Sequence, residues 1–391
     1  ERNQPLLVSR CGANRRNMRL TDEQEMMRDS VRDFVETEVA PVASEAEENA
    51  QFPEEVWDML SELDLTSMTV PEEYGGFDAD TVTYSIINEE IARGHLSMAT
   101  ALSVHCLATS CISEFGTEEQ KDRWLPEMRD GRPVGAFALS EPHAGSNPAE
   151  MSTEARREGD EYVINGTKQW ITNGDRAGVV ILFAKTDRDD PDTVTQFLVP
   201  KDIDGLEVGP REKKMGLKAS DTTTLIFEDA RIPAENRLTE VGEGLKSAFS
   251  ILTGGRIAIA SQAVGLAQAA FEDAVEYANE REQFGKPIIE HQAVAQKLAD
   301  MGTDLQAARL LTRDAARKNE TGIHPKSASM AKYFASEAAV SIAEDAVHVH
   351  GGYGYTKDFD VERYYRDAKI TTIYEGTSEI QKKVIARHLK D

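Results

Sequence analysis

Residues 351–377 read GGYGYTKDFDVERYYRDAKITTIYEGT, and this stretch joins two segments whose hydrophobic patterns predict helices. The helix before it runs from about residue 326 to 349, and the helix after it begins near Ser378, which is spaced from Gln381 as in a capping box. Two further long, alanine-rich patterns come earlier, at residues 245–283 and 291–318. Four long helices in succession predict a four-helix bundle for this part of the chain.

Glu375 lies within the quoted stretch, between the apolar pair Ile373-Tyr374 and Gly376. A carboxylate just before a helix start can simply be a partner of the helix dipole. However, Gly376 leaves room for a ligand, and the apolar pair would desolvate the carboxylate and raise its pKa toward working pH. The pattern therefore also indicates a general base.

Upstream of the bundle, residues 133–236 change to the short patterns of strands. The predicted strands are 137–139, 161–164, 167–172, 178–185, 194–199 and 222–227, followed by a turn-rich segment at 228–236. Asn165-Gly166 separates two of them and favours a tight type I′ hairpin. Short strands joined by hairpins predict a small antiparallel barrel or sandwich.

The region from residue 19 to about 129 reads as helical, and Pro41 is expected to end its first helix. Two capping boxes are expected there, Thr21 with Gln24 and Thr117 with Gln120. The fold class is thus a multidomain α+β protein with the order helical, β, helical. We expect a non-core extension at 1–17, an N-terminal helical domain at 18–132, a central β domain at 133–240 and a helical bundle domain at 241–391.

The chain has 391 residues and a net charge of −25, spread along its length. Nucleic acid is disfavoured as a partner, because a phosphate backbone rewards clustered Lys and Arg. The dispersed acidity predicts the surface of a protein from the salt-loaded cytoplasm of a halophile, with an ordinary acidic protein as the alternative. Residues 1–17 hold four arginines and one acid, and they read as an extension upstream of Met18 rather than an organelle-targeting peptide.

Several other classes find no support in the sequence. No apolar run approaches the length of a membrane span, and the stretch at 257–270 is interrupted by polar residues. Three cysteines without a CxxC pair fit a reducing compartment, and Cys106 and Cys111 are expected to pack inside a helix. His348 and His350 lack a third ligand, so no metal site is predicted.

Two segments of the central region could face a flat polar ligand. In Phe137-Ala-Leu-Ser-Glu-Pro-His-Ala-Gly-Ser146, a strand runs into a loop of small residues whose N–H groups could approach a ring or a pyrophosphate, although a simple β-turn is the alternative. In Trp170-Ile-Thr172, an aromatic face and a hydroxyl lie on the same side of a strand, although core packing would also explain them. A Rossmann GxGxxG, a P-loop, GxSxG and HExxH are all missing from the sequence.

Together these segments resemble the acyl-CoA dehydrogenase family, over essentially the whole chain from residue 18 onward. The first signature of the family is followed through Ser146, with departures at Asn147 and Glu150. The second is followed within 351–367, whereas His348 stands where Gln is typical and helps bind FAD. The segment 374–377, Tyr-Glu-Gly-Thr, matches the catalytic stretch of the family.

The resemblance implies FAD-dependent oxidation of a fatty acyl-CoA thioester to a trans-2-enoyl-CoA, a step of fatty-acid β-oxidation. Glu375 would take the α-proton as general base while the β-hydride goes to flavin N5. The resemblance also implies a homotetramer and an electron-transfer flavoprotein as electron acceptor. Among substrates, short or medium straight acyl chains are expected, because the chain looks most like butyryl-type members.

The resemblance assigns binding roles by position. The flavin ring would contact Phe137, Leu139, Ser140, Gly145, Ser146, Trp170, Ile171 and Thr172. The FAD of a neighbouring subunit would contact Arg281, Gln283, Phe284, His291, Gln292, His348, Gly351 and Gly352. Thr377 and Glu379 would also contact FAD. The acyl-CoA would contact Ser146, Thr253, Arg256, Tyr374 and Gly376.

Other assignments stay open at this point. Some members of the family place the base one residue before Arg256, but here that residue is Gly255, which favours Glu375. Flavin-dependent oxidases and monooxygenases share the architecture and react with oxygen instead. A catalytically silent acyl-CoA-binding protein is the alternative from another class, although the intact segment around Glu375 argues against it.

Overall fold

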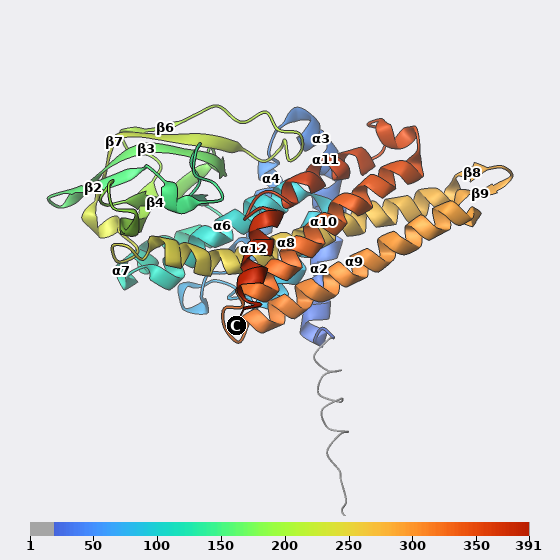
Figure 1. Ribbon diagram of the computed structural model, residues 1–391, viewed down its shortest axis with the longest axis horizontal. Helices are drawn as coiled ribbons and strands as arrows, with labels where there is room; N and C mark the ends of the chain where they lie inside the picture. Colours follow the sequence, from blue (N-terminus) through green and yellow to red (C-terminus); the bar gives the residue numbers. More distant parts are fainter. Residues whose placement is uncertain (1–18, 391) are drawn as a thin grey trace, which may run out of the picture.

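The structure, a computed structural model, describes residues 19–390 (Figure 1). The expectations about residues 1–17 therefore lie outside the described part of the chain. Figure 1 shows the β domain on one side of the molecule, with the long helices α8, α9 and α10 extending away from it toward a small hairpin of β8 and β9. The order helical, β, helical is that predicted from the sequence.

The N-terminal part consists of helices, and both expected capping boxes are present at the starts of α2 and α7. Both cysteines of this part lie buried in α6, as expected from the sequence. The helices are α2 (Asp22–Phe34), α3 (Ala40–Asn49), α4 (Glu54–Glu62), α5 (Thr81–Gly94), α6 (Leu96–Phe115) and α7 (Glu118–Met128).

The expectation that Pro41 ends the first helix is wrong. Helix α2 passes through a π-helical turn at Val35–Val39 and continues as α3, which ends at Asn49. Pro41 lies in the first turn of α3, where a backbone N–H is not needed for the helical ladder. The wider π turn supplies the extra residue that lets the chain pass the proline without a break.

The central part is one seven-stranded sheet in the order β1-β4-β2-β3-β7-β6, with β5 paired to β4. Most pairs are antiparallel as expected, but β1 and β4 run parallel over five residue pairs, so the sheet is mixed. The strands are β1 (Val134–Ala138), β2 (Glu154–Glu158), β3 (Glu161–Thr172), β4 (Ala177–Lys185), β5 (Val194–Pro200), β6 (Leu206–Val208) and β7 (Thr222–Pro233). Strand β7 thus extends through most of the segment expected to be turn-rich.

The predicted hairpin at Asn165-Gly166 is also wrong, because β3 runs through these residues without a break. The tight turn lies six residues earlier, at Gly159-Asp160, between the paired ends of β2 and β3. A bulge against β7 occupies the predicted site, and the Asn165 amide pairs with the backbone and side chain of Asp229. Gly166 is needed there because an added Cβ would lie 2.5 Å from Thr153 Oγ1.

The C-terminal part contains the predicted long helices and one additional short helix, α11, inside the quoted stretch. Helix α8 is central, with alanines buried along most of its length against α5, α9 and α10. The helices are α8 (Gly244–Glu280), α9 (Gln292–Asn319), α10 (Pro325–His350), α11 (Val361–Thr371) and α12 (Ser378–Arg387); the short strands β8 (Glu282–Gln283) and β9 (Lys286–Pro287) lie between α8 and α9.

Two helices, α6 and α8, are long and apolar enough to cross a membrane by length and composition. The expectation that no apolar run approaches the length of a membrane span is therefore wrong by this criterion. Their most apolar windows are 83% and 78% buried inside the protein. This burial identifies them as core helices, which pass the same test.

The β domain meets the helices at a shared apolar cluster. Ala144 of the small-residue loop packs in this cluster with Leu107 of α6 and Ile251 of α8, while Phe137 and Leu139 pack against its edge. The loop, the first turns of α8 and the middle of α6 are therefore held around one place in the molecule.

Candidate active site

Glu375 lies in the loop between α11 and α12, and the backbone there is unusual. Glu375 and Gly376 both have positive φ angles, 54° and 93°. A non-glycine residue in this region is strained, and such strain is found preferentially at functional sites. At the next position, the positive φ of Gly376 disfavours any side chain, and an added Cβ would also lie 2.7 Å from Gln381 Nε2.

The capping box expected at Ser378 is wrong by one residue. Thr377 is the N-cap of α12 and accepts a hydrogen bond from a backbone N–H of its first turn. Gln381 instead donates from Nε2 to the carbonyl oxygens of Glu375 and Gly376, at 3.1 and 2.9 Å. This side chain therefore fixes the loop that carries Glu375 rather than the end of the helix.

Burial raises the pKa of Glu375 to about 7, while the positive charges of Arg256 and Lys332 act to lower it. Its Oε2 is buried and has no hydrogen-bond partner among residues 19–390. A buried carboxylate oxygen without a partner destabilises the fold. At such a pKa, the group can change its protonation state near neutral pH, as a general base must.

The space for this carboxylate is provided by α8 and α6. A Cβ built on Gly255 would lie 2.8 Å from Glu375 Oε2 and 3.3 Å from Leu107 Cδ2. The missing side chain at 255 is therefore what accommodates the carboxylate in its present position.

Ile373 and Tyr374 were both expected to shield the Glu375 carboxylate from water, and only Tyr374 is placed to do so. Ile373 is 49% exposed, whereas Tyr374 is half-buried. The hydroxyl of Tyr374 lies 3.4 Å from both Thr100 Oγ1 and Gln262 Oε1. Tyr374 thus closes the site on the side of α6 and α8.

Two cations with buried side chains lie near Glu375. Lys332 of α10 is fully buried, and its Nζ donates to the Gly376 carbonyl oxygen at 2.8 Å. Arg256 of α8 is buried, and its Nε has no partner within the described chain. Burial lowers the pKa of Lys332 to about 8 and also lowers that of Arg256, and in both cases the nearby Glu375 opposes this shift.

The two segments predicted to face a flat ligand lie side by side. The backbone N–H of Gln169 donates to the carbonyl oxygen of Ser140 at 2.9 Å, which joins the loop after β1 to the end of β3. Trp170 has a φ of 64° and is 58% exposed. The register of β3 against β7 shifts between Lys168 and Ile171, so the regular strand alternation assumed for Trp170 and Thr172 does not apply.

A buried ion pair anchors the small-residue loop after β1. Lys168 Nζ donates to Glu141 Oε1 at 2.9 Å and to the Leu139 carbonyl at 3.1 Å. Glu141 also accepts from the backbone N–H groups of Ser152 and Thr153. The conformation of the small-residue loop is thus determined by contacts inside the β domain.

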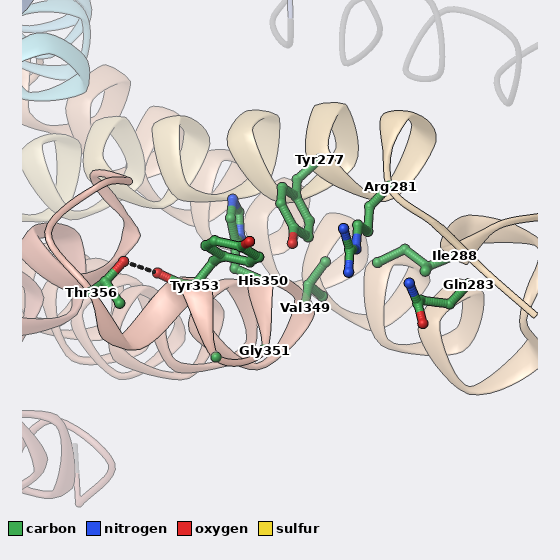
Figure 2. A pocket seen from close by; sticks show the side chains of 10 residues that line it. Tyr277, Arg281, Gln283, Ile288, Val349, His350, Gly351, Tyr353 and Thr356 are labelled. Atoms are coloured by element: carbon green, nitrogen blue, oxygen red, sulfur yellow. Dashed lines mark hydrogen bonds between the residues drawn. The ribbon is translucent and has the colours of Figure 1, made fainter.

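The predicted contacts of a neighbouring subunit's cofactor meet at the far end of the helices. A cavity of about 550 Å³ is lined there by Arg281 at the end of α8, by Gln283 of β8, and by Gly351 and Gly352 after α10 (Figure 2). Tyr277, Ile288 and Tyr353 form further parts of its wall. Figure 2 shows the Arg281 side chain between those of Tyr277 and Gln283.

Four other predicted residues lie around this end of the helices but do not line the cavity. Phe284 is 94% exposed at the tip of the β8–β9 hairpin, and the ring of His291 lies edge-on to it at 5.8 Å. Gln292 begins α9, and His348 is exposed on α10, with Nδ1 3.9 Å from Asp345. Within residues 19–390, no three His, Cys, Asp or Glu side chains are placed to hold a metal ion.

This cavity and Glu375 are separate places in one protomer. Lys332, which contacts the Glu375 loop, and His350, which lines the cavity, are 18 residues apart on the single helix α10. At 1.5 Å per residue, their backbones are about 27 Å apart. The chain therefore presents two separate places, one around the Glu375 carboxylate and a distal cavity lined by aromatic and cationic residues, which we call half-sites because the family resemblance implies FAD contacts at each.

At the first half-site, the fold places a carboxylate with a buried, unpartnered oxygen against α8 and α6. Three family models match the chain: the N-terminal domain of acyl-CoA dehydrogenase at residues 21–132, its middle domain at 136–230 and its C-terminal domain at 242–390. The chain belongs to the acyl-CoA dehydrogenase family. It is an FAD-dependent enzyme that dehydrogenates acyl-CoA thioesters.

Individual relatives are similar over nearly the full length. The chain is 46% identical to an acyl-CoA dehydrogenase of Bacillus subtilis, covering 95% of this chain and 99% of the relative. It is 46% identical to the mitochondrial short-chain specific acyl-CoA dehydrogenase of Rattus norvegicus, covering 95% and 91%. Among solved structures, butyryl-CoA dehydrogenase from Megasphaera elsdenii matches with a TM-score of 0.92 at 39% identity, covering 95% and 99%. A chain from a structure of the electron transferring flavoprotein of Acidaminococcus fermentans matches with a TM-score of 0.93 at 41% identity, covering 95% and 98%.

The residues present fit FAD. Added Cβ atoms on Gly145, Gly351 and Gly352 would meet nothing within 4 Å, so open space lies beside both half-sites. The exposed indole of Trp170 offers an aromatic face next to the loop that carries Gly145. At the distal cavity, Arg281 offers a guanidinium group suited to a pyrophosphate.

Sequence reasoning missed two residues that hold the site, Lys332 and Gln381. One signal could have indicated Lys332. It falls in phase with the buried positions Ala328, Ala335 and Ala339 of α10, where a charged residue needs a partner. Nothing comparable marks Gln381, because its position on α12 fits a capping residue equally well.

Proposed function

We propose that Glu375 is the general base of the dehydrogenation and removes the α-proton of the thioester. The observation that carries this proposal is its buried, unpartnered Oε2 beside the gap at Gly255. The carboxylate accepts the α-proton as the β-hydrogen leaves with its electron pair, so that a trans double bond forms between the two carbons. Bound FAD supplies the acceptor for that hydride.

The chain's own residues provide the remaining requirements of the reaction. Burial keeps the pKa of the carboxylate near neutral, and Leu107 lies beside the same gap at Gly255 as its Oε2. Thr253 and Arg256 lie three residues apart on α8, and we assign them, with Ser146 and Gly376, to the acyl-CoA. Phe137 to Ser146, Trp170 to Thr172, Thr377 and Glu379 are assigned to FAD.

Replacement of the base tests this function. Glu375→Gln fills the same volume without a basic oxygen, so the variant should fold, retain FAD and lose more than nine-tenths of its turnover, since general bases contribute about 10²-fold or more. Flavin bleaching by butyryl-CoA under anaerobic conditions measures the step directly. A variant that retains more than about a tenth of the wild-type rate would exclude Glu375 as the base.

For the substrate, we propose short, straight acyl chains. The support is that the relatives' names include short-chain specific acyl-CoA dehydrogenase and butyryl-CoA dehydrogenase. A panel of straight acyl-CoA thioesters, together with branched and glutaryl thioesters, tests this through kcat/KM. Highest activity on a branched or dicarboxylic substrate would contradict it.

For the electron acceptor, we propose an electron-transfer flavoprotein rather than oxygen. The support is the likeness to a chain from a structure titled for an electron transferring flavoprotein. Peroxide formed at the full rate of substrate oxidation would instead indicate the oxidase alternative.

For assembly, we propose a homotetramer in which the distal cavity of one subunit completes the FAD site of another. The support is the separation of about 27 Å between the two half-sites within one chain. Light scattering on the flavin-loaded protein checks this, and a monomer with a full complement of flavin would contradict it.

We further propose that the protein works in the cytoplasm of a halophile, on the basis of its net charge of −25.

A further inference from the structure

Lys332 is an unusual lysine because it is completely buried and yet has no ion-pair partner within 4 Å among the described residues. An ammonium group in the protein interior destabilises the fold unless it is paired and hydrogen-bonded. The other fully buried lysine, Lys168, follows this rule and pairs with Glu141 at 2.9 Å. The hydrogen bond of Lys332 goes to the Gly376 carbonyl instead, at 2.8 Å.

The carbonyl that Lys332 holds belongs to the left-handed dipeptide Glu375-Gly376. Both residues have positive φ, which an isolated loop would not favour at Glu375. Donors from two different helices meet at this dipeptide: Lys332 from α10, and Gln381 from α12 at 2.9 and 3.1 Å. Such contacts can maintain a strained backbone that aims a side chain.

The charges around Lys332 come from three helices and one loop. Glu375 lies in the loop, Arg256 on α8, Glu337 on α10 itself and Glu379 on α12. The positive charges that face Glu375 are those of Arg256 and Lys332. Lys332 is therefore the cation that combines a direct bond to the loop with a favourable charge for the ionised base.

We propose that Lys332 is a positioning residue for the dehydrogenation, which holds the Glu375-Gly376 backbone through the Gly376 carbonyl and stabilises the ionised form of Glu375 from beneath the loop. This rests on the proposed function of Glu375 as base. Lys332 does not touch the reacting atoms. It keeps the carboxylate both aimed and deprotonated before the α-proton is taken.

Two substitutions separate its two effects. Lys332→Met removes the charge and the donor at similar length, whereas Lys332→Gln removes the charge but keeps a donor. Both variants should move the acid limb of the kcat/KM profile for butyryl-CoA upward by about one pH unit, because the base loses a nearby positive charge. Only Lys332→Met should also lose about tenfold or more of kcat on the alkaline plateau, because the loop is no longer held.

The matched control is Ser336→Ala, one turn further along the same helix. Ser336 is buried and donates to the Thr371 carbonyl at 2.8 Å, just before the same loop, but it carries no charge. This variant should lower the melting temperature and leave the acid limb where it is. Flavin absorbance and melting curves confirm that each variant is folded and loaded before it is assayed.

The result that would overturn the inference is an acid limb unchanged in both Lys332 variants, with plateau kcat within twofold of the wild type. A shift in Ser336→Ala equal to that in the Lys332 variants would also overturn it, because it would reflect loosening of the loop alone. An active Glu375→Gln enzyme would instead defeat the proposed function, so the two failures are distinguishable.

Discussion

Position 255 determines how the Glu375 carboxylate is placed, and Gly255→Ala tests this. A Cβ there would lie 2.8 Å from Oε2, so the carboxylate must move aside. We expect kcat to fall about tenfold or more, because small misplacements of a reacting group have large effects on rate. The melting temperature should not fall, since alanine favours a helix over glycine by about 1 kcal/mol.

The control for this prediction is Gly302→Ala on α9. An added Cβ there meets only the ring of Phe271, at 3.3 Å, and lies outside the site. It should gain similar helix propensity with unchanged kcat. If Gly255→Ala kept full activity, the carboxylate would not need the position that it has in the structure.

The raised pKa of Glu375 predicts a specific pH dependence. The base must be ionised to accept a proton, so log kcat/KM should rise with unit slope below about pH 7 and level off above it. An ordinary glutamate, at 4.5, would place this limb more than two pH units lower. Stopped-flow flavin bleaching from pH 5 to 9 measures it, with a substrate whose binding does not change over this range.

The same shift has a consequence for stability. Between 4.5 and about 7 the folded state holds a proton on Glu375 that the unfolded state has released, so this group lowers stability as pH rises through that window. Glu375→Gln cannot release a proton. Its melting temperature relative to wild type should therefore be higher at pH 8 than at pH 5.

At the scale of the structural elements, the buried ion pair of Glu141 and Lys168 holds the loop after β1 in place. Glu141→Gln leaves the buried ammonium without its counter-charge, which typically destabilises a protein by about 3–5 kcal/mol. Because the loop is assigned to the flavin, FAD should also be released at lower temperature. Flavin fluorescence and circular dichroism melts report the two effects separately.

A double variant serves as the control for this pair. Glu141→Gln with Lys168→Met removes both charges and should recover much of the lost stability, since replacing both partners is far less harmful than removing one. If Glu141→Gln alone melted and held flavin like the wild type, the pair would not anchor the loop.

The sequence predicts elements well where their signals are local. The capping boxes at Thr21 and Thr117 use only residues within one turn, and both are present. Asn165-Gly166 gives an equally strong local signal for a hairpin, but pairing with β7 and the close approach of Thr153 convert it into a bulge. Pro41 fails as a helix end for a similar reason, because packing of α3 continues the helix beyond the π turn.

The candidate site follows the same rule. The desolvation of Glu375 could be predicted in part from its neighbour Tyr374, whereas its role as base stays a prediction. The contacts of Lys332, Gln381 and Leu107 could not be predicted, because they join residues distant in the sequence or redirect a side chain that also fits a cap. The distal cavity itself was not predicted. Four of the eight residues that the resemblance assigns to a neighbour's FAD line it, and the length of α10 explains why they lie far from Glu375.

At the scale of the whole molecule, charge is the dominant feature. Removing the +3 of residues 1–17 from the −25 of the chain leaves −28 on residues 18–391. Lysine is scarcer than arginine, with 18 against 26 residues, so few flexible cations offset the surface acids. Most ion pairs of the described chain involve exposed side chains, as in Arg132 with Glu54 and Asp58, and such pairs contribute only about 0–1 kcal/mol each.

We therefore predict that the assembled, FAD-loaded protein is maintained in molar KCl or NaCl and weakens at low salt. Self-repulsion destabilises the compact state, and the screening length falls from about 10 Å at 0.1 M to about 3 Å at 1 M. If the proposed homotetramer forms, its interfaces should fail first, because the acidic composition would bring like charges together there, and FAD should leave with them if the distal cavity belongs to a neighbour's site. Light scattering, thermal melts and flavin fluorescence across both salts at equal ionic strength test this. If the melting temperature and flavin retention did not change as salt fell below 0.1 M, the self-repulsion would be too weak to affect stability. Screening of the exposed ion pairs would lower stability at high salt, but this opposing effect is too small to hide a strong repulsion.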